Sequence, residues 1–159
     1  MTFTLRPMTA AELAARTGTL IEEYALDLHR SRNLPLDRAR AEARRQSAEL
    51  LPDGVDTDGA LLFTAVADGV AVGWVWISLP APDRPDTAWI YEITVDPEHR
   101  GNGHGRATMR AAEDELARRG VPRLALNVFG DNTAAIRLYE SLGFRTTSMQ
   151  MAKPVEPRP

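Results

Sequence analysis

The sequence predicts a single α/β domain in which helices cover both faces of a mixed sheet. The chain has 159 residues, 43% hydrophobic and 26% charged, which suits one globular domain with one sizeable core. Strand and helix patterns follow in the order strand, two helices, three strands, helix, strand, helix, strand. Such an order packs naturally as a sheet between two helical layers. No repeat or long linker divides the chain, so we expect one domain over residues 1–153.

The first fifty residues predict a strand and two helices. Residues 2–6 alternate apolar and polar side chains, as a short strand does. Thr9 and Glu12 form a capping-box pattern at the start of a helix that runs to about residue 33. A second helix is expected from Pro35, a favourable first-turn residue, to residue 50 or 51.

The middle of the chain predicts a hairpin and a further strand. Asp68-Gly69 separates the runs 61–67 and 70–79, and this dipeptide favours a two-residue hairpin turn. A loop with three prolines follows at 80–86, and then a strand at 87–95. We expect this strand to lie centrally in the sheet.

The C-terminal part predicts a helix at 103–119, a strand at 121–129, a helix at 131–142 and a last strand at 144–151. The proline-rich residues 154–159 are expected to be a disordered tail. If the last strand were exposed at the sheet edge, it could support a homodimer.

Composition narrows the function classes. The net charge of −3 gives no basic field for nucleic acid or anionic lipid, and no segment is long and apolar enough to span a membrane. The chain has no cysteine, so disulfides, thiolate metal sites and a cysteine nucleophile are excluded. We therefore expect a cytoplasmic protein with no bound metal.

A glycine-rich loop, Arg100-Gly101-Asn102-Gly103-His104-Gly105-Arg106, joins the strand at 87–95 to the next helix. Glycines allow positive φ and close approach of a ligand, and the helix start offers unpaired amides to a phosphate. A Walker A loop would need a lysine where Arg106 stands, and a Rossmann loop would need glycine there. A simple helix-capping turn stays possible, although it would rarely need three alternate glycines.

The third kind of phosphate loop is arginine or glutamine, two residues, glycine, one residue, then glycine or alanine, which Arg100, Gly103 and Gly105 match. The residues at 95–100 lead into this loop, and the segment Asn132 to Phe144 follows it. Together the three segments resemble the cofactor-binding segments of the GNAT superfamily of N-acetyltransferases. The resemblance is strong over residues 90–144, and the first half resembles some small bacterial stand-alone members.

The resemblance implies a mostly antiparallel sheet with a splayed cleft that binds acetyl-CoA as acetyl donor. In that arrangement the cofactor lies between the strand ending at Val95 and the strand ending near Asn127. The Val95 amide could also stabilise the oxyanion. The implied cofactor-binding residues are Ile93, Thr94, Val95, Arg100, Gly101, Asn102, Gly103, His104, Gly105, Arg106, Asn127 and Asn132. Asn132 could equally be only the N-cap of its helix.

Tyr139 is implied as the general acid for the departing thiolate, the alternative being that it only packs in the core. Glu92 is the candidate general base, because a carboxylate in a covered strand is costly unless it is paired or functional. It could instead form a salt bridge, or point elsewhere if the strand has a bulge. In the ribosomal-protein N-terminal acetyltransferases that the sequence resembles, a glutamate on the later strand is the base, and the matching residue here, by its spacing from Tyr139, is Asn127.

The expected function is direct acetyl transfer to a primary amine of a small molecule or peptide. The alternative is a non-catalytic module that binds acyl-CoA; a phosphotransferase that binds ATP is a more remote one. We expect the acceptor pocket to use the first two helices, the loop at 80–86 and aromatic side chains, namely Tyr24, Trp74, Trp76, Trp89 and Tyr91. His29, His99 and His104 offer no convincing base.

Overall fold

The structure is a computed structural model that describes residues 1–158. Its elements are β1 (Phe3–Pro7), α1 (Ala10–Arg32), α2 (Leu36–Leu50), η1 (Gly54–Asp56), β2 (Ala60–Ala67), β3 (Val70–Ser78), β4 (Thr87–Val95), η2 (Pro97–His99), α3 (His104–Arg118), β5 (Arg123–Leu126) and α4 (Thr133–Ser141). The five strands form one sheet in the order β1-β2-β3-β4-β5. The first four are antiparallel, and β5 pairs with β4 in parallel.

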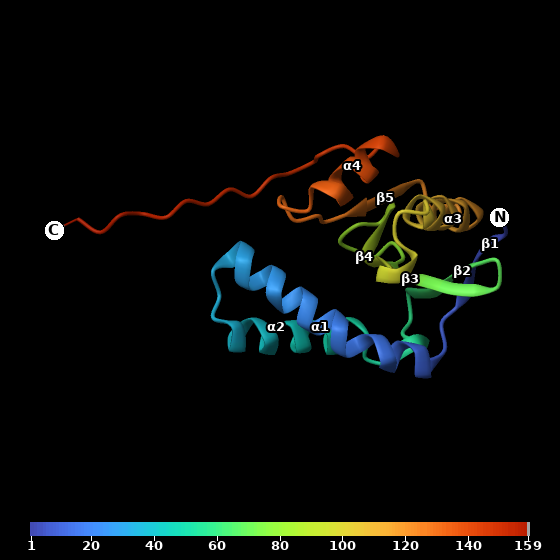
Figure 1. The fold of residues 1–159 in the computed structure, drawn as a ribbon, viewed down its shortest axis with the longest axis horizontal. Coiled ribbons are helices and arrows are strands. Elements are labelled where there is room, and N and C mark those ends of the chain that lie inside the picture. The colour runs from blue at the N-terminus through green and yellow to red at the C-terminus, as the bar shows by residue number, and fades with distance from the viewer. Residues whose placement is uncertain (159) are drawn as a thin grey trace.

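The sheet lies between two helical layers, as the sequence predicts. In Figure 1, α1 and α2 cover one face of the sheet, while α3 and α4 lie on the other. The larger core joins Val75 and Ile77 of β3 to Met109 and Leu116 of α3. A second core packs Trp74 and its neighbours against the other helical layer. This confirms the α/β fold class.

Local signals at the chain's turns are formed as expected. The Thr9 hydroxyl accepts from the Glu12 amide at 3.2 Å and the Glu12 carboxylate accepts from the Thr9 amide at 2.8 Å, which completes the capping box. Asp68 and Gly69 have φ angles of 48° and 82° and connect β2 to β3. Gly73 of β3 is needed for another reason, because a Cβ there would lie 2.0 Å from the Thr94 carbonyl oxygen.

The sheet splays open between β4 and β5. These strands pair only from Thr87 opposite Arg123 to Ile90 opposite Leu126. β4 then continues to Val95, and within residues 1–158 no strand pairs with its edge beyond Ile90 on that side. The splay therefore leaves backbone groups of β4 facing a cleft.

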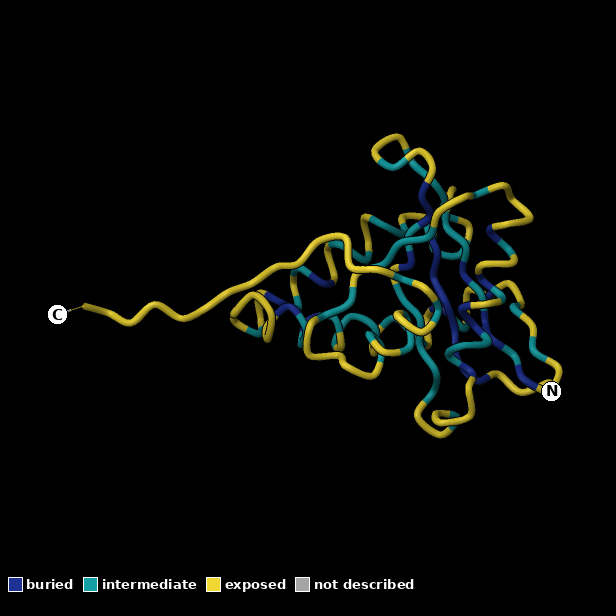
Figure 2. Tube along the Cα trace, turned by 90° about the horizontal axis from the view of Figure 1, so that it is seen from above, coloured by how far each residue is buried: buried dark blue, intermediate teal, exposed yellow. Residues whose placement is uncertain are grey.

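The predicted last strand at 144–151 is wrong. These residues have no regular secondary structure and run outward with residues 152–158, exposed along most of their length (Figures 1 and 2). No strand of the described residues pairs with this segment. β5, which precedes it, has four residues instead of the predicted nine, and Met149 is 75% exposed. The homodimer prediction loses the strand on which it rested.

Candidate functional site

One large cleft opens where β4 and β5 diverge, and it is lined from both helical layers. Its walls include β4, the loop after it, the start of α3, α4 and one face of α1. Among residues 1–158 no group of three or more His, Asp or Glu is placed to hold a metal ion. No helix in that range is long and apolar enough to cross a membrane.

The glycine-rich loop forms the end of the cleft at the start of α3. Gly101 and Gly103 have φ angles of 79° and 78°, which explains why glycine stands there. Gly103 is the N-cap of α3 and no side chain caps this helix end, so its first amides are available to an anion. A Cβ on Gly105 would lie 3.3 Å from Leu138, so this glycine lets α4 approach α3 closely.

Three side chains of the loop fix its shape. The Arg100 Nε donates to the Val95 carbonyl at 3.0 Å, which ties the loop back to the end of β4. The Asn102 amide donates to the carbonyls of His99 and Arg100. Arg106 donates to the Ser141 hydroxyl at 2.7 Å and so joins α3 to α4. The loop is therefore held to both walls of the cleft.

His104, which the resemblance implies as a cofactor-binding residue of the glycine-rich loop, is largely buried. It is the first residue of α3, 9% exposed, and its ring stacks on Phe3 at 6.2 Å between centroids. The helix start lies over β1, so the imidazole is covered although its residue lines the cleft. His29 lies outside the cleft lining, with its Nδ1 2.6 Å from the Leu34 carbonyl oxygen.

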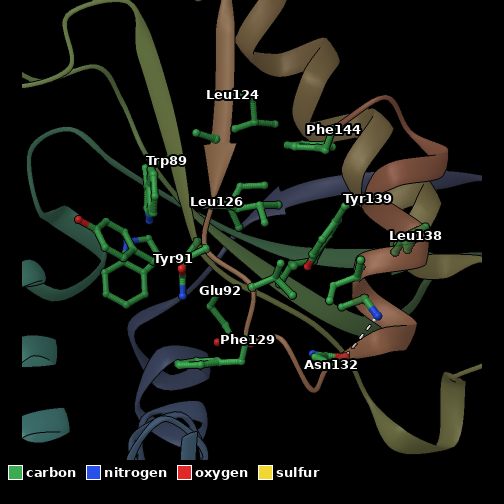
Figure 3. A pocket seen from close by; sticks show the side chains of 18 of the residues that line it. Trp89, Tyr91, Glu92, Leu124, Leu126, Phe129, Asn132, Leu138, Tyr139 and Phe144 are labelled. Carbon is green, nitrogen blue, oxygen red and sulfur yellow. Dashed lines mark hydrogen bonds between the residues drawn. The ribbon is translucent and has the colours of Figure 1, made fainter. Parts of the chain in front are cut away.

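A bulge in β4 decides where Glu92 points. Trp76 pairs with Glu92 while Ile77 pairs with Ile90, which leaves Tyr91 as an extra residue. The regular alternation of strand side chains therefore breaks at Tyr91, and Tyr91 lies against Trp76 with ring centroids 4.8 Å apart. Figure 3 shows Trp89, Tyr91 and Glu92 gathered on one side of the cleft.

The surroundings of Glu92 favour its neutral form. Burial raises the pKa of the Glu92 carboxyl to about 7, and the negative charges of Glu23 and Asp27 on α1 contribute further. The Thr94 hydroxyl donates to Glu92 Oε1, which works in the opposite direction by stabilising the carboxylate. No ion pair engages Glu92 within the described residues, so the salt-bridge alternative is not realised there.

Tyr139 faces the cleft from α4, on the other side from Glu92 (Figure 3). Its ring is half-buried and lies 5.7 Å from that of Phe144. Burial, with a further contribution from Glu92, raises the pKa of the Tyr139 phenol to about 12. The phenol therefore keeps its proton at neutral pH and can donate a hydrogen bond into the cleft.

The two asparagines are at the β5 side of the cleft. Asn132 is the N-cap of α4, and its Oδ1 accepts from the Ala135 amide at 3.2 Å. Asn127 follows the end of β5, lines the cleft and is exposed. Its amide cannot take a proton, so this position supplies no base.

The acceptor side differs in part from the prediction. Tyr24, Trp89 and Tyr91 line the cleft. Trp76 also reaches its wall but is only 4% exposed, and Trp74, 2% exposed, is buried in the core without lining the cleft. The loop at 80–86 is absent from the cleft lining, because Arg84 holds it against the ends of β3 and β4 through the carbonyls of Leu79 and Thr87.

Sequence reasoning missed two acids of α1 that line the cleft, Glu23 and Asp27. Their spacing from Leu20 places all three on one helix face, and this signal was present in the sequence. It also missed Arg16, which forms a bidentate ion pair with Asp96 just after β4, with the second contact at 3.0 Å.

Comparisons with known proteins point to one family. A model described as the Acetyltransferase (GNAT) family matches residues 21–144. The uncharacterized N-acetyltransferase YdgE of Bacillus subtilis is 27% identical over 154 residues, which cover 96% of this chain and 98% of that protein. The crystal structure of YycN from Bacillus subtilis has a TM-score of 0.91, with 27% identity, and the match covers 98% of this chain and 100% of that one.

The mycothiol acetyltransferase of Nocardiopsis dassonvillei is 41% identical over 116 residues. That match covers 67% of this chain and 35% of the longer protein.

Proposed function

We propose, from the premise that this chain belongs to the Acetyltransferase (GNAT) family, that it transfers the acetyl group of acetyl-CoA directly to a primary amine of a small molecule or peptide. Membership makes the chain an acetyl-CoA-dependent acyltransferase. The residues that act and the amine acceptor are the parts that we propose. The observation that carries this proposal is the pair Glu92 and Tyr139, which face one cleft with raised pKa values.

In this proposal the glycine-rich loop binds the pyrophosphate of acetyl-CoA. Its support is the uncapped start of α3, where the amides of residues 101–106 meet the positive end of the helix dipole. The pantetheine arm then runs along the unpaired edge of β4 at Ile93, Thr94 and Val95. Asn127 and Asn132 flank the arm from the other side of the cleft.

Glu92 is the proposed general base. A primary amine is protonated at neutral pH, and only its neutral form has the lone pair that attacks the thioester carbonyl carbon. With a pKa of about 7, Glu92 is partly ionised at that pH and accepts the proton directly or through water. An ordinary exposed glutamate would be a weaker base, so burial serves the reaction.

Tyr139 is the proposed general acid. Attack forms the new C–N bond and a tetrahedral intermediate whose nitrogen carries one proton more than the amide product. That proton passes through water to solvent or to the departing sulfur, and collapse of the intermediate breaks the C–S bond and places its electron pair on sulfur. Tyr139, protonated because its pKa is raised to about 12, donates a hydrogen bond that strengthens as sulfur becomes negative. The Val95 amide is proposed to stabilise the oxyanion of the intermediate. Direct transfer agrees with a chain that has no cysteine to carry the acetyl group.

The proposal is tested by measuring release of the coenzyme A thiol from acetyl-CoA against a broad panel of amines. We expect acceptor-dependent release, with an acetylated amine identified by mass spectrometry. Tight binding of acetyl-CoA without turnover on any acceptor, peptides included, would contradict the proposal and favour a non-catalytic acyl-CoA-binding module.

A further inference from the structure

One face of α1 forms a fixed wall of the acceptor side of the cleft. Leu20, Glu23, Tyr24 and Asp27 recur at helical spacing and all line the cleft. The helix is held at one end by the Arg16–Asp96 ion pair to the end of β4. In its middle, the Tyr24 hydroxyl donates to Gln46 of α2 at 2.9 Å. These contacts hold the helix in place, and neither Glu23 nor Asp27 takes part in them.

This wall adds negative charge to the cleft that Glu92 also lines. Glu23 and Asp27 both act on Glu92 as negative neighbours, although they are far from it in sequence. Burial raises the pKa of the Asp27 carboxyl. The negative charges of Asp131 and Glu23 raise this pKa further, and the positive charge of Arg30 lowers it. Within residues 1–158 neither Glu23 nor Asp27 takes part in an ion pair.

Aromatic faces complete the same side of the cleft. Tyr91 packs on Trp76 at 4.8 Å, and Trp89 lies on the same side in Figure 3. Aromatic rings attract cations through their faces, most strongly where water is displaced. Aromatic faces and unpaired carboxylates together suit a cationic group and disfavour an anionic one.

The reacting amine alone does not account for these acids. It must lose its positive charge before it attacks, with Glu92 as the group proposed to accept the proton. A second ammonium group in the same acceptor, with an ordinary pKa of about 10.4, would remain charged throughout the reaction. Its ion pair to the α1 wall would thus be the same in the ground state and the transition state, and such uniform binding lowers KM with little change in kcat.

We propose that Asp27 and Glu23 are specificity-determining residues that select acceptors with a second positive charge, namely aliphatic diamines and polyamines. This inference rests on the proposed function and adds the substrate class to it. Asp27 holds the non-reacting ammonium, Glu23 supports it from one turn away, and the aromatic faces contact the methylene chain and the cation.

The test compares putrescine with n-butylamine, which has the same carbon chain and lacks the second amine. Initial rates of thiol release give kcat and KM for each acceptor. We expect kcat/KM to be about ten-fold higher for putrescine, as an ion pair with cation–π support would give, with most of the difference in KM. The preference should decrease as ionic strength rises.

Variants connect the preference to α1. Asp27→Asn should reduce the putrescine-to-butylamine ratio of kcat/KM several-fold, and Asp114→Asn, which removes an exposed acid of α3 outside the cleft, should keep the wild-type ratio. Glu23→Gln, at an exposed position, keeps the test decisive if Asp27→Asn fails to fold. Equal kcat/KM for the two amines in the wild type, or an unchanged ratio in both α1 variants, would overturn the selectivity alone. Failure to acetylate any amine would overturn the proposed function, and this inference with it.

Discussion

Glu92→Gln removes the proposed base while it keeps nearly the size and shape of the side chain. In the wild type, kcat/KM should rise with pH through an apparent pKa of about 7, because only the ionised carboxylate accepts a proton. In the variant this limb should be absent, and the maximal rate should be lower by roughly 10²–10⁴-fold. Initial rates of thiol release over a range of pH measure both effects.

The raised pKa of Glu92 also predicts a change in stability. The folded protein binds the proton of Glu92 more tightly than the unfolded chain, so this group's contribution is most favourable at low pH and weakens as pH rises from 4.5 to about 7. That displacement corresponds to roughly 3 kcal/mol. Glu92→Gln avoids burial of the charge, so above about pH 7 its free energy of unfolding should exceed that of the wild type by up to about 3 kcal/mol. Urea unfolding at an acidic and an alkaline pH measures the difference.

Two further variants make the prediction specific. Thr94→Val removes the hydroxyl that donates to Glu92, so the pKa of Glu92 and the acidic limb should move to higher pH. Glu156→Gln, in the exposed C-terminal segment, should retain the wild-type profile. The reasoning is refuted if Glu92→Gln keeps the limb, or if the limb follows the acceptor's own pKa when the acceptor is changed.

Three other substitutions test separate parts of the account. Tyr139→Phe should lower kcat by roughly 10- to 100-fold while calorimetry shows little change in coenzyme A affinity, because the hydroxyl acts on the developing thiolate; an unchanged kcat would remove its role as acid. Gly73→Ala should destabilise the fold by about 1–3 kcal/mol in urea, since its Cβ would meet the Thr94 carbonyl oxygen at 2.0 Å, and wild-type stability would show that the strands are not packed so closely. Asn132→Ala should cost about 1 kcal/mol of stability by removing the N-cap of α4, which an unchanged melting temperature would contradict.

Much of the fold could be predicted because its signals are local. The capping box at Thr9 and the Asp68-Gly69 turn each depend on a few neighbouring residues, and both form as expected. The strand at 144–151 could not be judged in this way, because a strand needs a partner. β5 ends at Leu126, where its pairing with β4 also ends, and nothing in the residues at 144–151 themselves indicates this.

The same distinction applies to the candidate site. The glycine-rich loop and Tyr139 could be identified from motifs in one stretch of sequence, and both line the cleft. The direction of Glu92 depends on the bulge at Tyr91, which a period of two along the strand cannot reveal. The proximity of α1 to Glu92 joins residues far apart in the chain, so only the folded structure brings Asp27 into the account.

The central claim is that acetyl-CoA occupies the cleft between β4 and β5 with its reacting end between Glu92 and Tyr139. A crystal structure with coenzyme A bound tests this most directly. The account predicts the pyrophosphate on the amides of residues 101–106, the pantetheine arm along β4 and the sulfur within hydrogen-bond reach of the Tyr139 hydroxyl. A pyrophosphate bound away from this loop, or a sulfur beyond the reach of Tyr139, would contradict it.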